Sequence, residues 1–263
     1  MDYWIHKSAV VEEGVEIGQG TEVGPFCHLR SGSVLGKGCR LETGVILYPR
    51  VLLGEGVVVG SHAVLGDDPQ FVGFDRSIPS GVSIGKGTVV RAGVTVHRSI
   101  LPGGVTRVGE DCYLMTQSHV GHDAMVGSRV VVANACQIAG HVEIGDDAFL
   151  GGGSLYHQFV RIGGGVMIAG GAVLTKDIAP HLLAGERNRV SGLNLVGLRR
   201  RGVSAASVRE LKRYFQALMK QPGPIEEQAR AILKEGQAVS GKEGQDFLRF
   251  CVEPSRRGIA KGI

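Results

Sequence analysis

The chain is short of several residue types, and each shortage excludes a class of protein. Its 263 residues include nine prolines, five cysteines and one tryptophan, and aromatic residues make up 5%. An odd number of cysteines without a C-x-x-C pair argues against a disulfide framework, so we expect reduced thiols and a cytoplasmic protein. No apolar run reaches the roughly 18 residues of a membrane-spanning helix, and the opening MDYWIHKSAV lacks the segments of a signal peptide. We therefore expect neither export nor stable membrane insertion.

Charge of neither sign dominates the composition. The formal net charge of +4 is too small to indicate a nucleic-acid partner by itself, and none is expected. Hydrophobic residues at 43% and charged residues at 21% exclude a disordered chain. The length allows one or two domains.

Glycine is abundant, with 42 residues, and it follows a pattern. Every sixth residue is aliphatic from Val11 to Leu65, and a second run extends from Ile84 to Leu174 with breaks only at Pro102 and Tyr156. Many of these residues precede a glycine, as in IGQG, LGKG and IGDD. A period of six predicts a parallel β-helix, in which three hexads form one coil and stacked coils bury a continuous aliphatic column. Glycine suits the corners because it tolerates conformations that a Cβ opposes.

This repeat resembles that of the hexapeptide-repeat acyltransferases, whose coils wind left-handed. The fold that the resemblance implies is an all-β left-handed parallel β-helix. The left-handed winding is implied by the resemblance alone, because the six-residue period does not determine the hand of the coils.

Breaks in the repeat locate what lies outside the prism. The 19-residue step from Leu65 to Ile84 predicts an external loop near 66–83, and Pro102 predicts a smaller one near 99–107. After about residue 178 a linker, 179–197, leads to helical sequence. Ser204 is expected to cap a helix that runs to about Lys220, and two more helices are expected over 224–236 and 244–253. We assign 1–190 to the β-helix and 191–263 to a C-terminal α-helical domain whose short helices pack as one bundle.

Histidines gather in the middle of the chain. The spacings of His97, His122, His141 and His157 predict that they stack along one edge of the prism in successive coils. Adjacent imidazoles lower one another's pKa, because a second positive charge nearby is unfavourable, and a neutral histidine is then available near pH 7.

Two chemistries suit such a row of histidines. One is a zinc site with an open position, built from His97, His119 and His122, as in the hexapeptide-repeat carbonic anhydrases. The other is general-base catalysis, in which a neutral imidazole takes a proton from a hydroxyl or amine that attacks an acyl thioester. Asp123, directly after His122, favours the second chemistry if corner geometry turns both side chains to one side. We therefore expect no metal.

Motifs along the whole chain make the resemblance specific. HVGHDAMVG, AGHVEIG, YHQFVRIG, GLNLVGLRRRG, VTVHRS and FCVEPSRRGI are similar to motifs of the acyl-carrier-protein:UDP-N-acetylglucosamine O-acyltransferases, which begin lipid A synthesis. The extra N-terminal domain of the sister N-acyltransferases has no counterpart in this sequence. The resemblance implies transfer of a 3-hydroxyacyl chain from acyl carrier protein, with no cofactor besides that donor, by a homotrimer with clefts between its prisms.

The resemblance also implies roles for single residues. His122 is expected to be the general base, Asp123 its partner, and Gly140 the backbone donor to the oxyanion. Gly170 falls where the family sets acyl-chain length. The residues expected to bind the sugar and nucleotide are Gln70, His97, His141, His157, Gln158, Asn194 and Arg200. A basic face is expected to receive phosphate and the acidic carrier protein: Arg199, Arg200, Arg201, Arg209, Lys212 and Arg213.

The sequence departs from the family on the sugar side. The loop PQFVGF keeps Gln70 but has Phe71 and Gly73 where the family has an aspartate and a lysine that touch the sugar. Val196 replaces a glutamate near the nucleotide, while Arg187 and Arg189 add charge. Losing a charged pair indicates a different or differently held acceptor. Acylation of UDP-N-acetylglucosamine or a close UDP-amino-sugar at the 3-position is the first interpretation. The alternative is another nucleotide sugar, with coenzyme A as the acyl carrier.

Overall fold

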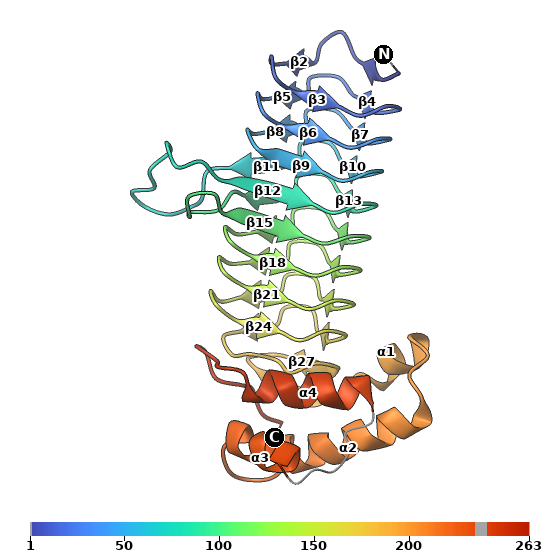
Figure 1. The fold of residues 1–263 in the computed structure, drawn as a ribbon, viewed down its shortest axis with the longest axis vertical. Coiled ribbons are helices and arrows are strands. Elements are labelled where there is room, and N and C mark those ends of the chain that lie inside the picture. Colours follow the sequence, from blue (N-terminus) through green and yellow to red (C-terminus); the bar gives the residue numbers. More distant parts are fainter. Residues whose placement is uncertain (1, 235–240, 263) are drawn as a thin grey trace.

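The protein folds as a triangular prism of stacked coils with helices at one end (Figure 1). The computed structural model describes residues 2–234 and 241–262. Neighbouring coils pair as parallel strands, which form one sheet on each side of the prism. The predicted parallel β-helix is confirmed.

Each sheet takes one short strand from each coil. Sheet A contains β1 (Trp4–Ile5), β4 (Glu22–Val23), β7 (Arg40–Leu41), β10 (Val58–Val59), β13 (Val89–Val90), β16 (Tyr113–Leu114), β19 (Val131–Val132), β22 (Phe149–Leu150), β25 (Met167–Ile168), β27 (Leu182–Gly185) and β28 (Arg189–Leu193). Sheet B contains β2 (Val10–Val11), β5 (His28–Leu29), β8 (Ile46–Leu47), β11 (Val64–Asp67), β14 (Thr95–His97), β17 (His119–Val120), β20 (Gln137–Ile138), β23 (Leu155–Tyr156) and β26 (Val173–Leu174). Sheet C contains β3 (Glu16–Ile17), β6 (Val34–Leu35), β9 (Val51–Leu53), β12 (Gly81–Ile84), β15 (Val105–Val108), β18 (Met125–Val126), β21 (Glu143–Ile144) and β24 (Arg161–Ile162).

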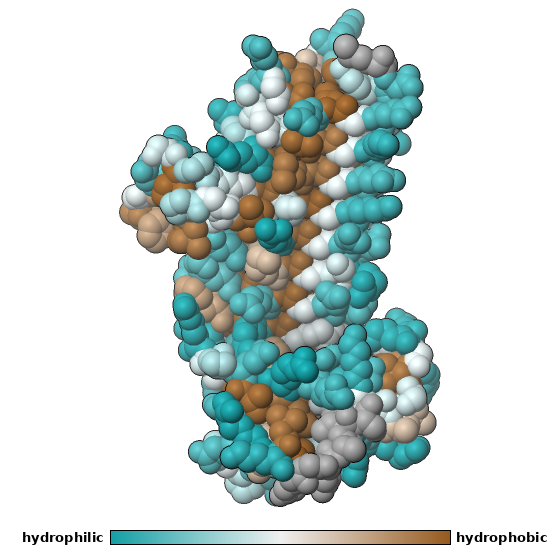
Figure 2. All heavy atoms as spheres, in the orientation of Figure 1, coloured by the Kyte–Doolittle hydropathy of each residue, from teal (hydrophilic) through white to brown (hydrophobic). Residues whose placement is uncertain are grey.

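The core is the aliphatic column that the six-residue period predicts. In most strands the second residue points inward, and from Val23 onward these residues are at most 4% exposed. Tyr156, a break in the repeat, keeps the inward position at 2% exposure, and its hydroxyl lies 3.0 Å from Ser154 Oγ. In Figure 2 an apolar band runs along the prism between polar flanks. Burial of the inward aliphatic column, which lies beneath the surface, stabilises the stack by about 25 cal/mol per Å² of apolar surface removed from water.

Glycine serves the coils for two reasons, of which the sequence indicated only the first. Third corner positions such as Gly14 and Gly32 have φ of 83° and 79°, the left-handed region that favours glycine. The glycine directly after an inward aliphatic residue has another cause. A Cβ on Gly109 would lie 2.5 Å from a backbone carbon of Gly127 in the next coil. Close approach of stacked backbones therefore requires glycine there, whatever its φ.

Two loops leave the prism at neighbouring coils (Figure 1). The first connects β11 to β12, and the second connects β14 to β15, at the two predicted breaks. Both are narrower than expected, 68–80 and 98–104, because the flanking residues extend the sheet pairing.

The expected linker over 179–197 is wrong. Residues 182–193 form the antiparallel hairpin of β27 and β28. Within sheet A, β27 also pairs in parallel with β25. This hairpin covers an edge that would otherwise leave backbone groups unpaired. The predicted domain boundary at 190 falls within β28.

Four helices follow: α1 (Leu195–Arg200), α2 (Ala205–Met219), α3 (Ile225–Lys234) and α4 (Lys242–Val252). Ser204 accepts from Ser207 N–H as the N-cap of α2, as predicted, whereas α1 was not expected. The end of the predicted helix 224–236 lies outside the described residues, and α4 begins two residues before its prediction. The last three helices pack on one another. Arg161 joins them to the prism, because it donates to buried Asp177 at 2.8 Å and lies over the Phe250 ring.

All five cysteines are free and buried, as expected for reduced thiols. Among the described residues, no helix has the length and apolar character needed to cross a membrane.

Candidate active site

Several of the predicted site residues meet at the corner between sheets B and C, where the two external loops emerge. A cavity of about 250 Å³ lies there. Its lining includes Gln70 from the first loop, His97 and His122 from successive coils, and Gly140 and Gln158 from the next two. These five residues are therefore brought together, while their roles remain predictions.

His122 and Asp123 form a hydrogen-bonded pair. His122 Nδ1 donates to Asp123 Oδ2 at 2.9 Å, and both side chains are 9% exposed. Asp123 has φ of 59°, and this left-handed corner turns its carboxylate toward the preceding imidazole. In a strand the two would face opposite ways. The orientation leaves His122 Nε2 free to accept a proton, since no hydrogen bond of the described residues uses it.

The Asp123 carboxylate is held from three sides. Besides His122, it accepts from Ser99 Oγ and from Ile100 N–H at 3.1 Å, and Asp123 N–H donates to Thr106 Oγ1 at 2.8 Å. Burial by itself would raise the pKa of Asp123, but the hydrogen bonds from His122, Ser99 and Ile100 together lower it. Asp123 is therefore an anion at neutral pH.

Gly140 leaves space for the His122 ring. A Cβ at this position would lie 2.5 Å from His122 Nε2 and Cε1, so any other residue would displace the imidazole. Among the hydrogen bonds of residues 2–234 and 241–262, none uses Gly140 N–H. This free donor beside the imidazole fits an oxyanion contact.

The histidines pair across coils instead of forming one stacked column. The His97 ring packs edge-on against His119 at 4.7 Å between centroids, and His122 packs against His141 at 5.0 Å. His97 and His157 take the first position after the inward residue, His122 the second and His141 the third, which the spacings did not resolve. His157 stands apart on the surface, with Nδ1 donating to Gln158 O at 3.1 Å.

Burial is the first cause of the lowered histidine pKa values, and neighbouring imidazoles add to it. Burial, then His97 and His122, lower the pKa of His119 to about 4. Burial also lowers the pKa of His97 and of His141, with the charge of His122 as a smaller contribution. The sequence indicated only the smaller cause of these lowered pKa values, the neighbouring imidazoles. Burial could not be predicted from it, because burial depends on loops that cover the corner.

The set of possible metal ligands differs from the zinc set considered from the sequence. In the described part of the chain, donor atoms of His122, Asp123 and His141 lie within 4.8 Å of one another. His97 and His119 are not in this group. Asp123 already accepts three hydrogen bonds, which suits an orienting carboxylate better than a metal ligand.

The remaining predicted residues lie on other edges. Gly170 lines an apolar cavity of about 660 Å³ together with Met167 and Leu183. Asn194 caps α1: its side chain accepts from Gly197 N–H at 2.9 Å and donates to Gly165 O at 3.0 Å. Arg200 is exposed in the last turn of α1.

Several residues around the His122–Asp123 pair were not predicted from the sequence. Ser99, Ile100 and Thr106 contact Asp123. The break in the repeat near 99–107 was the available signal, because a loop leaving the corner beside Asp123 can return groups to it.

Comparisons with known proteins find similar sequences along nearly the whole chain. A family described as UDP N-acetylglucosamine O-acyltransferase, domain 2, matches residues 177–260, and a hexapeptide repeat of succinyl-transferase matches 71–98 and 141–176. An acyl-acyl-carrier-protein:UDP-N-acetylglucosamine O-acyltransferase of Paraburkholderia phymatum is 42% identical over 98% of this chain and 99% of its own. One from Campylobacter concisus is 34% identical, covering 98% of both chains.

Solved structures carry the same fold. UDP-N-acetylglucosamine acyltransferase from Campylobacter jejuni matches with a TM-score of 0.90 at 34% identity, covering 98% of this chain and all of that one. The Francisella novicida enzyme matches with 0.92 at 31% identity, covering 98% and 94%. The left-handed prediction is thereby confirmed. By motifs, fold and full-length identity, the chain belongs to the acyl-acyl-carrier-protein:UDP-N-acetylglucosamine O-acyltransferases.

Proposed function

We propose that the protein transfers an acyl chain from acyl carrier protein to the 3-hydroxyl of UDP-N-acetylglucosamine, the first step of lipid A synthesis. The observation that carries the proposal is the His122–Asp123 pair in a cavity that also contains Gln70 and Gly140. Full-length relatives bear the same activity in their names.

The residues support a direct acyl transfer. His122 Nε2 takes the proton of the sugar hydroxyl as its oxygen attacks the thioester carbonyl. Asp123 stabilises the resulting imidazolium, and Gly140 N–H donates to the oxyanion of the tetrahedral intermediate. The carbon–sulfur bond then breaks, and the imidazolium returns the proton to the carrier thiolate. The products are the O-acyl sugar and the free carrier thiol.

The arrangement of two cavities favours a homotrimer. The histidine cavity lies at the corner after sheet B, whereas the apolar cavity of Gly170 lies at the corner after sheet A. A threefold assembly brings the first edge of one prism beside the second edge of its neighbour, so that the apolar cavity receives the acyl chain. Exposed Phe149, Leu155 and Met167, at 37%, 44% and 45%, are apolar surface that such an interface would cover.

The helical end supplies a surface for an acidic carrier. Arg199, Arg209 and Lys212 line a groove of about 400 Å³ between α1 and α2, and Arg213 is exposed beside it. Guanidinium and ammonium groups attract an acidic protein at long range and orient it.

The compartment that fits the free, buried cysteines is the reducing cytoplasm, where acyl carrier protein is found.

A second acceptor is favoured by one observation. Phe71 is 54% exposed and Gly73 has no side chain to offer, so these two positions beside Gln70 lack the charged groups that would contact a hydroxyl sugar. A UDP-sugar with an amine at C3 does not depend on them. The test incubates purified protein with UDP-N-acetylglucosamine or its 3-amino analogue and acyl carriers or acyl-coenzyme A, with mass spectrometry of the products. No acylated sugar from any pair would overturn the proposed function.

A further inference from the structure

The oxygen of Asp123 that does not face His122 has a partner of its own. Ser99 Oγ donates to Asp123 Oδ1, while Oδ2 accepts from His122. Ser99 is fully buried. Its hydroxyl also accepts from Leu101 N–H at 2.9 Å, so both its donor and its acceptor capacity are used. The rotation of the carboxylate is thus set at both oxygens.

Ser99 is itself held by the first loop. Ser80 Oγ donates to Ser99 O at 2.5 Å, and Ser80 is 3% exposed. Arg98 Nη1 donates to Ser80 Oγ at 3.1 Å, so the Ser80 hydroxyl also has both capacities in use.

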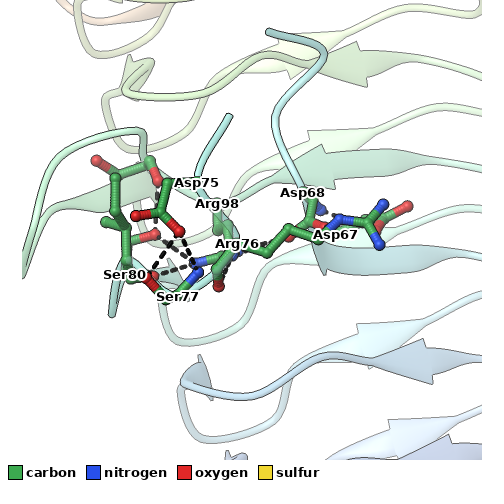
Figure 3. A network of polar contacts seen from close by, with 9 residues as sticks. Asp67, Asp68, Asp75, Arg76, Ser77, Ser80 and Arg98 are labelled. Carbon is green, nitrogen blue, oxygen red and sulfur yellow. Dashed lines mark hydrogen bonds and ion pairs between the residues drawn. The ribbon is translucent and has the colours of Figure 1, made fainter. Parts of the chain in front are cut away.

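Arg98 connects this chain of contacts to the rest of the loop (Figure 3). Its Nε and Nη2 donate to Asp68 Oδ1 at 3.0 and 2.9 Å, and Nη2 donates to Arg76 O at 3.0 Å. The guanidinium also lies 4.8 Å from the Phe74 ring. The residue is 9% exposed and directly follows His97 of the cavity.

We propose that Ser99 is a positioning residue for the catalytic pair: its hydroxyl fixes the rotation of the Asp123 carboxylate, and Ser80 with Arg98 holds Ser99 through the loop that carries Gln70. A fixed Oδ2 keeps the proton of His122 on Nδ1 and leaves Nε2 as the base. A freely rotating carboxylate would lose this preference. The inference deepens the proposed function and rests on it for its assay.

A double-mutant cycle separates this role from a structural one. Ser99→Ala is expected to lower kcat about tenfold with the KM for the sugar nearly unchanged, because ground-state binding does not use the hydroxyl. In an Asp123→Ala background the same substitution should change kcat less than about twofold, because nothing remains to be positioned. Equal factors in both backgrounds, or no effect in the wild type, would overturn the proposal.

Controls keep the cycle interpretable. Ser33→Ala removes another fully buried hydroxyl, in a coil far from the cavity, and should leave kcat unchanged. If Ser99→Ala does not fold, Ser80→Ala replaces it in the cycle, with an expected loss of about threefold in the wild type and none in Asp123→Ala.

One readout is independent of turnover. Imidazole ¹⁵N shifts of histidine-labelled protein, with His122 assigned by its alanine variant, should show the Nδ1–H form in the wild type and a mixture in Ser99→Ala. Identical shifts would overturn the positioning role even if no acceptor is turned over. An inactive wild type with changed shifts would instead overturn only the proposed function.

Discussion

The corner after sheet B is built on one plan in the first coils, residues 2–65, and in the later coils, residues 84–174. In the first coils it carries surface contacts: Glu12 accepts from His28 Nε2 at 2.8 Å and from Ser31 N–H at 2.9 Å. In the later coils the second and third positions of this corner carry the buried His122–Asp123 pair. The inward column is alike in both. External loops that cover the later corner, and not the coil itself, turn polar corner residues into a site, because burial strengthens each polar contact.

Backbone conformation at the corner is shared by the two regions. The third corner position is left-handed in both regions: Gly14, Gly32 and Arg50 occupy it in the first coils, and Asp123, His141 and Phe159 in the later ones. A non-glycine residue there costs about 1 kcal/mol. Arg129 has the same conformation at another edge, so the conformation is no sign of a site by itself. What distinguishes Asp123 is that this conformation aims its carboxylate at His122.

The largest expected effect tests the corner histidine. His122→Ala should lower kcat about 10²-fold or more, because a positioned general base contributes 10² to 10⁴. His28→Ala, on sheet B in the first coils, is the matched control and should retain full activity. Steady-state kinetics on folded protein decides. A His122→Ala enzyme with more than about a tenth of wild-type activity would mean that another group is the base.

Gly140→Ala is expected to lower kcat about 30-fold, since the added methyl would overlap the His122 ring and displace it from its carboxylate. Gly192→Ala is the control, because a Cβ there meets nothing within 4 Å. Kinetics with thermal unfolding of both variants checks the prediction. Normal activity in Gly140→Ala would show that the imidazole does not need its observed place.

The basic groove should matter next. Arg209→Glu with Lys212→Glu is expected to raise the KM for acyl carrier protein about tenfold at low salt, and the difference from wild type should shrink at high salt. Arg40→Glu makes half of this charge change on the exposed face of the first coils and should have little effect. A carrier KM that does not respond to salt in the wild type would contradict docking by charge.

The sugar loop is expected to give a smaller change. Phe71→Asp with Gly73→Lys should improve kcat/KM for UDP-N-acetylglucosamine about fivefold, less than two charged hydrogen bonds would contribute, because Gly73 has φ of 80° and lysine is strained there. Val72→Asp, at a neighbouring residue that is 99% exposed, controls for added charge. The 3-amino analogue should gain nothing. Efficient wild-type use of the ordinary sugar, unimproved by the double variant, would remove the case for a different acceptor.

Acid stability gives the smallest expected effect. Unfolded His119 binds its proton below about pH 6.5, whereas in the fold its pKa is about 4. Between these values the unfolded state binds more protons, so stability falls as pH falls through that window. The drop in Tm between pH 7.5 and pH 4.5 should be about 2 to 4 °C smaller for His119→Gln than for the wild type. Equal slopes of Tm against pH for wild type and His119→Gln would contradict the assignment.

Much of this protein followed from local patterns. Six-residue spacing predicts the prism and its core, and Ser204 marks the start of α2, because each rests on neighbours in sequence. The hairpin of β27 and β28 was missed, because its sequence carries no repeat and its strands form only by pairing with the last coil. His119 was grouped with His97 only as a possible zinc ligand, and their ring contact was not predicted, since facing rings depend on which position each takes in its coil.

By itself the sequence determined the repeat, the positions of its two breaks, the helical end and the motifs that place the chain in its family. Tertiary structure decided which side chains meet. Stacking brings residues about one coil apart into contact, and a loop adds to that distance: Ser99 and Asp123 are 24 residues apart, and Asp68 and Arg98 are 30. Spacing cannot tell which way a left-handed corner turns its side chain, or whether a loop folds back to cover it. Those two facts bury the His122–Asp123 pair and fix its geometry, because both depend on contacts with distant parts of the chain.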